Sequence, residues 1–206
     1  MNNMIRYFNI VIGGLIVILA MTSLTACSDD EWGNDNSEYE NVFIVAFADW
    51  GPKSNNDKSY NVSQGSHVEI PVQLWCEGTR SFDAEAFVYV DPKLSPGTDY
   101  QIVDANGNVL QQNPNGGYTL LYDLKTPDTT NNHRQQSIYV QALNGAKGDL
   151  TLMTFDPKDV DADGKLKISN GGTKPTDPDY YVPNNKTSQY EVRCITVNYK
   201  VKVTIQ

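Results

Sequence analysis

An acidic stretch in the C-terminal third of the chain carries the residues best suited to bind a cation. Asp159, Asp161 and Asp163 alternate before a glycine, which is the spacing of the first ligands and the turn glycine in a 12-residue calcium loop. The match then fails, because position 12 is Asn170 instead of a bidentate Glu. A backbone carbonyl and a remote carboxylate such as Asp156 would have to complete the shell. The stretch predicts either a calcium site or a solvated acidic turn.

Aromatic residues offer a second kind of chemistry, because the chain has 12 Tyr and 3 Trp. Flat rings stack on the apolar C–H faces of sugars, while a tyrosine hydroxyl can bond the polar edge. The candidates in loops or on the polar face of an expected strand are Trp50, Trp75, Tyr180 and Tyr181. Tyrosine and tryptophan are also ordinary strand residues, so a structural role is the alternative.

Catalysis finds little support in the sequence. The two histidines, His67 and His133, lie near no nucleophile motif, and no HExxH, GxSxG, phosphate loop or paired CxxC is present. We expect His67 to point to solvent from a strand and His133 to lie in a polar loop. The chain is therefore predicted not to be an enzyme and to need no cofactor other than the calcium considered above.

The cysteines fall in two different sequence contexts. Cys27 follows an apolar N-terminal run, whereas Cys76 and Cys194 lie inside apolar strand patterns. In an oxidising compartment these two could form a disulfide if their strands were neighbours. They could equally serve as small buried hydrophobes.

The N-terminus has the order of a secretory signal. Arg6 precedes an apolar segment, Ile10 to Met21, which at about a dozen residues is shorter than the roughly 20 of a membrane-spanning helix. Leu24-Thr25-Ala26-Cys27 resembles the lipobox of bacterial lipoproteins, in which the cysteine is diacylated and becomes the first residue. The resemblance implies a signal peptide over 1–26 and a lipid anchor on Cys27. An ordinary secreted protein or an uncleaved anchor is the alternative.

The segment after Cys27 has the composition of a flexible tether. Six acids and no base occur between Ser28 and Asn41, a composition that cannot order itself by burying apolar surface. Acidic residues at this place resemble the surface-export signal of Bacteroidetes lipoproteins. We therefore expect a flexible tether over 27–41 and a surface-exposed protein on the outer membrane.

The formal net charge of −9 over 206 residues argues against a nucleic-acid partner, which would need a concentrated basic face. The remaining length suits one domain. We expect that domain to occupy residues 42–206.

Period-two alternation bounded by turn residues recurs through this domain, without sustained helical periodicity. The expected strands cover 42–47, 67–75, 84–90, 100–103, 118–124, 137–143, 150–155 and 190–205, the last with a phase change that suggests a bulge or a tight turn near Asn198. Asn106-Gly107 predicts a hairpin turn between 100–103 and 109–110. Residues 42–47 are apolar on both faces, which places them mid-sheet. Pro71 lacks a donor, so its strand is expected at an edge or with a bulge. The sequence predicts an all-β protein built as a single two-sheet β-sandwich, with a barrel as the alternative.

The order Ile70-Pro71-Val72, a strand, Gly97-Thr98-Asp99-Tyr100 and Ser137-Ile138-Tyr139-Val140 resembles the immunoglobulin-like or Calx-β-like sandwich of Bacteroidetes surface lipoproteins, including small accessory proteins of Sus-type glycan uptake. The resemblance covers about residues 62–155. It implies a surface-exposed accessory or binding role. Asp128-Thr129-Thr130 also resembles the short O-glycosylation acceptor of that phylum, with Thr129 as the acceptor.

Two functions follow from these observations. The first is a non-catalytic binding or accessory module in glycan capture, with a polysaccharide as its partner. The second is a structural or adhesive module that binds a surface protein, for example by strand addition at a sheet edge, with calcium stiffening the Asp159 turn.

Overall fold

The computed structural model describes residues 40–47, 58–91, 93–127, 133–159, 182–194 and 198–206. Nearly all of the regular structure in these ranges is β-strand. The strands are β1 (Val42–Phe47), β2 (Ser59–Val62), β3 (His67–Trp75), β4 (Ala84–Val90), β5 (Tyr100–Val103), β6 (Tyr118–Tyr122), β7 (His133–Ala142), β8 (Gly148–Met153), β9 (Val182–Lys186), β10 (Glu191–Cys194) and β11 (Lys200–Ile205). The described ranges hold no helix that could span a bilayer, and their one helical element is the three-residue 3₁₀ segment η1 (Pro157–Asp159).

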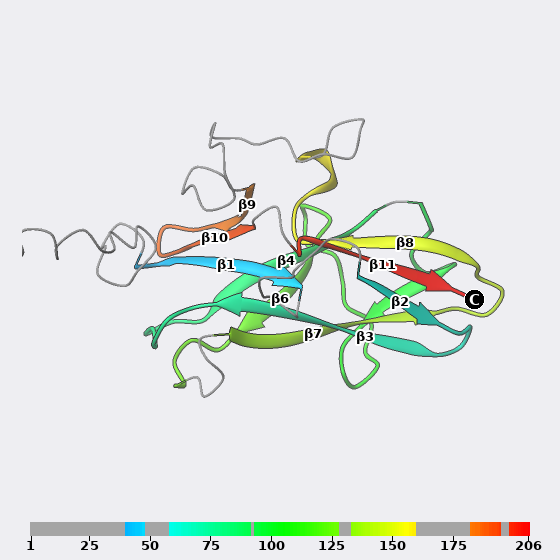
Figure 1. The fold of residues 1–206 in the computed structure, drawn as a ribbon, viewed down its shortest axis with the longest axis horizontal. Helices are drawn as coiled ribbons and strands as arrows, with labels where there is room; N and C mark the ends of the chain where they lie inside the picture. Colours follow the sequence, from blue (N-terminus) through cyan, green and yellow to red (C-terminus); the bar gives the residue numbers. More distant parts are fainter. Residues whose placement is uncertain (1–39, 48–57, 92, 128–132, 160–181, 195–197) are drawn as a thin grey trace, which may run out of the picture.

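The strands form two sheets. One has the order β5-β7-β3-β1-β10-β9 and the other the order β2-β11-β8-β4-β6. Figure 1 shows β1, β9 and β10 gathered at one end of the molecule and β8 and β11 towards the other. No ladder between described strands joins one sheet to the other, so the two-sheet β-sandwich is confirmed and the barrel is not formed.

Burial follows the alternation of the sequence. Along β3, Ile70, Val72 and Leu74 are buried in the core, whereas His67 and Glu69 are exposed. His67 therefore points to solvent, as expected. β1 lies between β3, to which it is antiparallel, and β10, to which it is parallel, so its predicted central position is also confirmed.

The expectation that Pro71 marks an edge or a bulge is wrong. β3 lies inside its sheet, and Pro71 stands opposite Ser137 in an unbroken ladder with β7. The described pairing with β1 reaches Val72, the residue after Pro71, and does not include Pro71 itself. Because alternate pairs of an antiparallel ladder exchange no hydrogen bonds, one of them can hold a proline without losing a bond.

The long C-terminal segment divides between the two sheets. β10 belongs to the six-stranded sheet and β11 to the five-stranded one. Asn198 lies between them with φ of 51°, and its carbonyl accepts a hydrogen bond of 2.8 Å from Phe47 N–H. The expected phase change therefore falls where the chain passes from one sheet to the other.

Two strands and the start of a third were missed in the sequence. β2 and β9 were not predicted, and β7 begins at His133, so the placement of His133 in a loop is wrong. In β9 the buried side chain is Asn184, which lies at a break in the register with β10. A strand whose inward residue is an amide leaves no apolar alternation to detect.

Cys76 and Cys194 are both buried and are not joined by a disulfide. β1 lies between their strands, since Ile44 pairs with Trp75 on one side and Val45 with Cys194 on the other. Two strand spacings of about 4.8 Å exceed the roughly 7 Å that a disulfide tolerates between Cα atoms. Burial raises the pKa of Cys194 to about 12, as expected of an unreactive thiol in the core.

Candidate functional site

A concave site with uncharged walls lies at one lateral edge of the sandwich. β5 is an edge strand of the six-stranded sheet and β6 an edge strand of the five-stranded sheet. Residues 109–112 cross from one to the other, because Val109 bridges to Val103 and Gln112 bridges to Tyr118. Leu110 N–H also donates to the Ile102 carbonyl at 2.8 Å. We call this side, made of β5, residues 109–112 and β6, the open seam.

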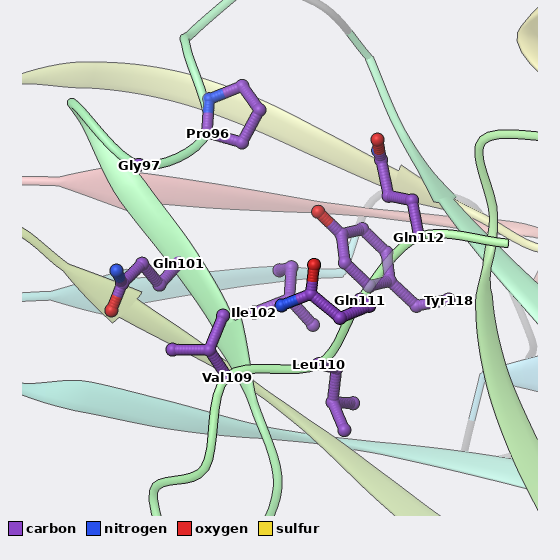
Figure 2. A pocket seen from close by; sticks show the side chains of 9 residues that line it. All are labelled: Pro96, Gly97, Gln101, Ile102, Val109, Leu110, Gln111, Gln112 and Tyr118. Carbon is purple, nitrogen blue, oxygen red and sulfur yellow. The ribbon is translucent and has the colours of Figure 1, made fainter.

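A pocket of about 310 Å³ occupies the open seam. Figure 2 shows the ring of Tyr118 in the middle of its lining, with the side chains of Gln111 and Gln112 nearby. Its residues are Pro96, Gly97, Gln101, Ile102, Val109, Leu110, Gln111, Gln112 and Tyr118. Its volume is at the lower end of the range of about 300–1,000 Å³ typical of small-molecule sites.

Two tight turns hold the crossing segment in place. In the first, one carboxylate oxygen of Asp104 accepts the backbone N–H of Asn106 and of Asn108, each at 2.8 Å. The other accepts the Asn108 side-chain amide at 2.9 Å. Gly107 takes a positive φ of 82°, which a residue with a side chain rarely adopts. The predicted Asn-Gly turn is therefore formed, and its bonds lower the pKa of Asp104, with the Asn108 side chain the largest cause.

The second turn returns the chain into β6. Asn113 accepts backbone N–H groups of Asn115 and Gly117 through its side-chain oxygen, at 2.9 and 3.0 Å. Gly116 has φ of 84°. Gly117 is buried, and a Cβ atom there would lie 3.0 Å from Cε1 of Tyr89. These contacts fix where β6 begins and thereby place Tyr118.

The polar atoms of the pocket are uncharged. Its lining has no carboxylate, imidazole, amine or thiol, and the carboxamides of Gln101, Gln111 and Gln112 can each donate and accept hydrogen bonds. Tyr118 is the only titratable residue of the lining; burial raises its pKa, and a hydrogen bond with the Gln112 side chain opposes that rise. The phenol is therefore neutral at physiological pH.

Apolar groups stand beside these polar atoms. Val109 is 47% exposed, although large hydrophobic residues are usually buried. Leu110, which is partly exposed, adds further apolar surface to the lining, and Ile102 is buried behind it in the core. Neutral donors and acceptors next to apolar atoms suit an uncharged polyhydroxylated ligand, whose hydroxyl groups and C–H faces need both.

Comparisons with known proteins leave the family unassigned. No family model matches the sequence, and no curated protein matches it. Among solved structures, the N-terminal domain of PorA matches with 8% identity, 79% coverage of this chain, 95% coverage of that chain and a TM-score of 0.32. The third ScaB cohesin of R. flavefaciens, solved with a group 1 dockerin, matches with 13% identity, 79% coverage of this chain, 95% coverage of that chain and a TM-score of 0.33. AvmM, which catalyses macrocyclization in alchivemycin A biosynthesis, matches with 10% identity, 82% coverage of this chain, 93% coverage of that chain and a TM-score of 0.30.

These likenesses are too low to transfer any activity. The TM-scores of all three lie near 0.3, and their identities to this chain are 8–13%. The chemistry of this chain therefore has to be argued from its own residues.

The predicted aromatic platform lies largely outside the described residues. Trp50, Tyr180 and Tyr181 are not among them. Trp75 is described: it is the last residue of β3, partly exposed, and pairs with Ile44 and His133 in the six-stranded sheet. It is not part of the pocket lining.

Only some of the predicted calcium ligands lie among the described residues. Asp161 and Asp163 lie outside the described residues, whereas Asp156 directly precedes η1 and Asp159 is its last residue. Asp156 accepts Lys158 N–H at 3.0 Å and pairs with the Lys158 ammonium at 2.5 Å. Over the described ranges no group of three or more His, Cys, Asp or Glu residues could hold a metal ion. Calcium binding at this turn stays a prediction.

Cys27 and Thr129, the predicted lipidation and O-glycosylation sites, also lie outside the described residues. The pocket residues Gln101, Gln111, Gln112 and Tyr118 were not predicted. The available signal was two Asn-Gly dipeptides, at 106–107 and 115–116, with two glutamines between them. A short segment held between two such turns lies at the surface, so its side chains are candidates for ligand binding.

Proposed function

We propose that this protein is a lipid-anchored cell-surface module that captures uncharged glycans without catalysis, and that the open-seam pocket holds the sugar. The observation that carries the proposal is the lining of three carboxamides and one phenol beside apolar side chains, without a formal charge. Carboxamides match the mixed donor and acceptor pattern of sugar hydroxyls. A general base and a strong nucleophile, which glycan hydrolysis would need, are both missing from this lining.

The anchor is the second part of the proposal. Acyl chains on Cys27, a flexible tether over 27–41 and export to the outer leaflet of a Bacteroidetes-type outer membrane would hold the sandwich outside the cell. The sequence motif Leu-Thr-Ala-Cys supports this part. Mass spectrometry of the protein from its native membrane should find residue 27 as an acylated N-terminus. An unmodified Cys27, or residues 1–26 still attached, would refute it.

Affinity electrophoresis tests the pocket. The 206-residue protein should be retarded in gels containing at least one neutral polysaccharide of a broad panel. Tyr118→Phe removes one hydroxyl and Gln111→Ala one carboxamide, so each should weaken retention by about fivefold to tenfold, the effect of losing one hydrogen bond of about 1–1.5 kcal/mol. The matched controls, Tyr139→Phe and Gln135→Ala, change β7 residues outside the pocket and should leave retention unchanged. Equal retention of all four variants would refute the pocket, and no retention in any gel would refute the capture of uncharged glycans.

A second candidate function is binding of a surface protein by strand addition. β5 pairs with β7 only from Tyr139 to Ala142, so residues 133–138 have a described strand partner, β3, on one side only. In the other sheet, β6 is an edge strand, and its Leu121 is 56% exposed. A strand edge without a described partner, above all one that carries an exposed apolar residue, is the surface that an added strand uses. This candidate predicts that Leu121→Lys abolishes partner binding while glycan retention is unaffected.

A further inference from the structure

A second pocket, of about 320 Å³, lies on the outer face of the five-stranded sheet. Met153 of β8 pairs with Lys200 of β11, and the next pair, Leu152 with Val201, is buried in the core. Since neighbouring residues of a strand face opposite sides, Met153 and Lys200 lie on the outer face. Asp91 and Lys93, which follow β4, complete one wall.

The floor of this pocket is apolar and well packed. The rings of Phe155 and Tyr199 lie with centroids 4.7 Å apart and planes at 52°. Both residues are buried, as is Met153. The backbone beneath them is held by a hydrogen bond of 2.9 Å from Thr154 N–H to the Tyr199 carbonyl. A ligand would therefore meet a preformed surface, which lowers the entropic cost of binding.

Charge distinguishes this pocket from the first one. Lys93 forms an ion pair of 3.2 Å with Asp91, and the lysine side chain is 67% exposed. Ion pairs this exposed contribute little stability, so a competing anion can replace one partner. Lys200 has its ammonium 5.5 Å from the centroid of the Tyr199 ring, and among the described residues no ion pair involves it. Two lysines and one aspartate give the wall a charge of +1, in a chain whose net charge is −9.

We propose that this pocket binds the carboxylate-bearing ring of an acidic saccharide, a hexuronate unit, an inference that rests on the proposed role in glycan capture. The single negative charge of the uronate matches the +1 of the wall. The carboxylate accepts hydrogen bonds from Lys200 and Lys93, and Asp91, displaced from Lys93, accepts one from a ring hydroxyl. The C–H face of the sugar lies over the edges of Met153 and Tyr199 that reach the pocket, with Phe155 supporting Tyr199 from within.

Isothermal titration of the whole protein with trigalacturonate and with its methyl ester tests the site. The acid should bind, and the uncharged ester should bind about tenfold more weakly or worse. Raising NaCl from about 50 to about 500 mM should weaken binding of the acid, because salt screens exposed charges. Equal affinity for acid and ester, or displacement of the acid by an equal concentration of acetate, would overturn the proposal.

Substitutions at Lys200 test whether trigalacturonate binds in this pocket. Lys200→Gln should weaken trigalacturonate binding by about tenfold and Lys200→Arg, which keeps the charge, by much less. The matched control is Lys125→Gln, which removes the same charge from an ion pair with Asp83 outside the pocket and should have no effect. Unchanged binding by Lys200→Gln would overturn the assignment to this pocket.

The two proposals fail separately. If neutral polysaccharides still retard the protein and retention still depends on Tyr118, a failure with trigalacturonate removes the acidic site alone. If trigalacturonate binds through Lys200 but no neutral glycan is retained, the uronate site stands and the open-seam pocket is removed.

Discussion

The two lateral sides of the sandwich are closed in different ways. On one side, β9 lies against β4, and side chains bond directly to the β4 backbone. We call this side the closed seam, made of Asn184, Asn185 and Tyr190 against residues 85–87. On the other side, the open seam, a crossing segment spans the gap between the sheets and leaves a pocket.

The closed seam replaces a missing strand with side chains. β4 pairs with β8 only at Tyr89 and Val90, so its earlier residues lack a strand on that side. Asn184 accepts Phe87 N–H and donates to the Phe87 carbonyl, both at 2.8 Å. Its amide also donates to the Thr154 carbonyl. One carboxamide thus pairs with a strand edge as a peptide group would.

Neighbouring groups extend this pairing along β4. Asn185 donates to the Glu85 carbonyl at 2.9 Å, and Glu85 N–H donates to the Tyr190 hydroxyl at 3.0 Å. The Tyr190 ring stacks on Phe82 with centroids 5.7 Å apart. Amides on this side are committed to the backbone, whereas those of Gln111 and Gln112 at the open seam line a pocket. The same side-chain chemistry bonds to the backbone at one seam and lines the pocket of our proposed glycan site at the other.

The largest expected effect comes from Asn184→Ala. The substitution leaves one donor and two acceptors of the backbone without partners in a buried place, and each such group costs about 1–3 kcal/mol. We expect the free energy of unfolding to fall by about 3–5 kcal/mol, measured by urea denaturation.

Asn185→Ala is the matched comparison for that measurement. Its carboxamide bonds at the solvent-exposed end of the same seam, so the loss should be about 1 kcal/mol or less. Equal losses for the two variants would show that the closed seam does not depend on the buried amide.

The next largest effect concerns the open seam, through Gly117→Ala. A Cβ atom at Gly117 would lie 3.0 Å from Cε1 of Tyr89 and 3.2 Å from Cβ of Phe87. Overpacking of this kind costs about 1–3 kcal/mol, and we expect about 2 kcal/mol in the same assay. Gly116→Ala meets no atom within 4 Å and should cost about 1 kcal/mol, from its positive φ alone. A smaller loss at Gly117 than at Gly116 would contradict close packing at the start of β6.

Some strands could be predicted from the sequence and β9 could not, because their inward-facing side chains differ in chemistry. β1, β3 and β4 were predicted because apolar side chains repeat on their buried faces, and the Asn106-Gly107 turn was predicted from residue type. β9 was missed because its inward residue is polar and bonds to the backbone of another sheet. That bond is created by tertiary contact and leaves no periodic signal in the chain.

The open-seam pocket could not be predicted for a related reason. Gln101 lies on β5, and Gln111 and Gln112 lie on the crossing segment; only the pairing of that segment with both edge strands brings them to one pocket. Trp75, chosen for its exposed aromatic character, lies elsewhere on the same sheet. Residue type identified possible ligands of a sugar, but the topology decides which of them converge.

A smaller effect is expected when the pH is lowered, at the Asp104 turn that precedes the crossing segment. The pKa of Asp104 is lowered in the folded protein, chiefly by hydrogen bonds from Asn108. A lowered pKa means that the carboxylate stabilises the turn above its ordinary value of 3.8 and that this contribution is lost as pH falls through the lowered value. The amide NMR signals of Asn106 and Asn108 should therefore move together below about pH 4. Asp104→Asn should remove that transition, and a transition that persists in the variant would assign it to another group.

The smallest effect on stability should come from Leu121→Lys on β6. The side chain is 56% exposed, and surface substitutions usually change the free energy of unfolding by no more than about 0.5 kcal/mol. A charged residue at a strand edge also opposes pairing with another chain. We therefore expect an unchanged urea midpoint, together with loss of any binding that uses the open edge. A loss above about 1 kcal/mol would mean that Leu121 packs against the protein itself, and the contrast between a seam that holds the sheets together and a seam left for ligands would then weaken on the β6 side.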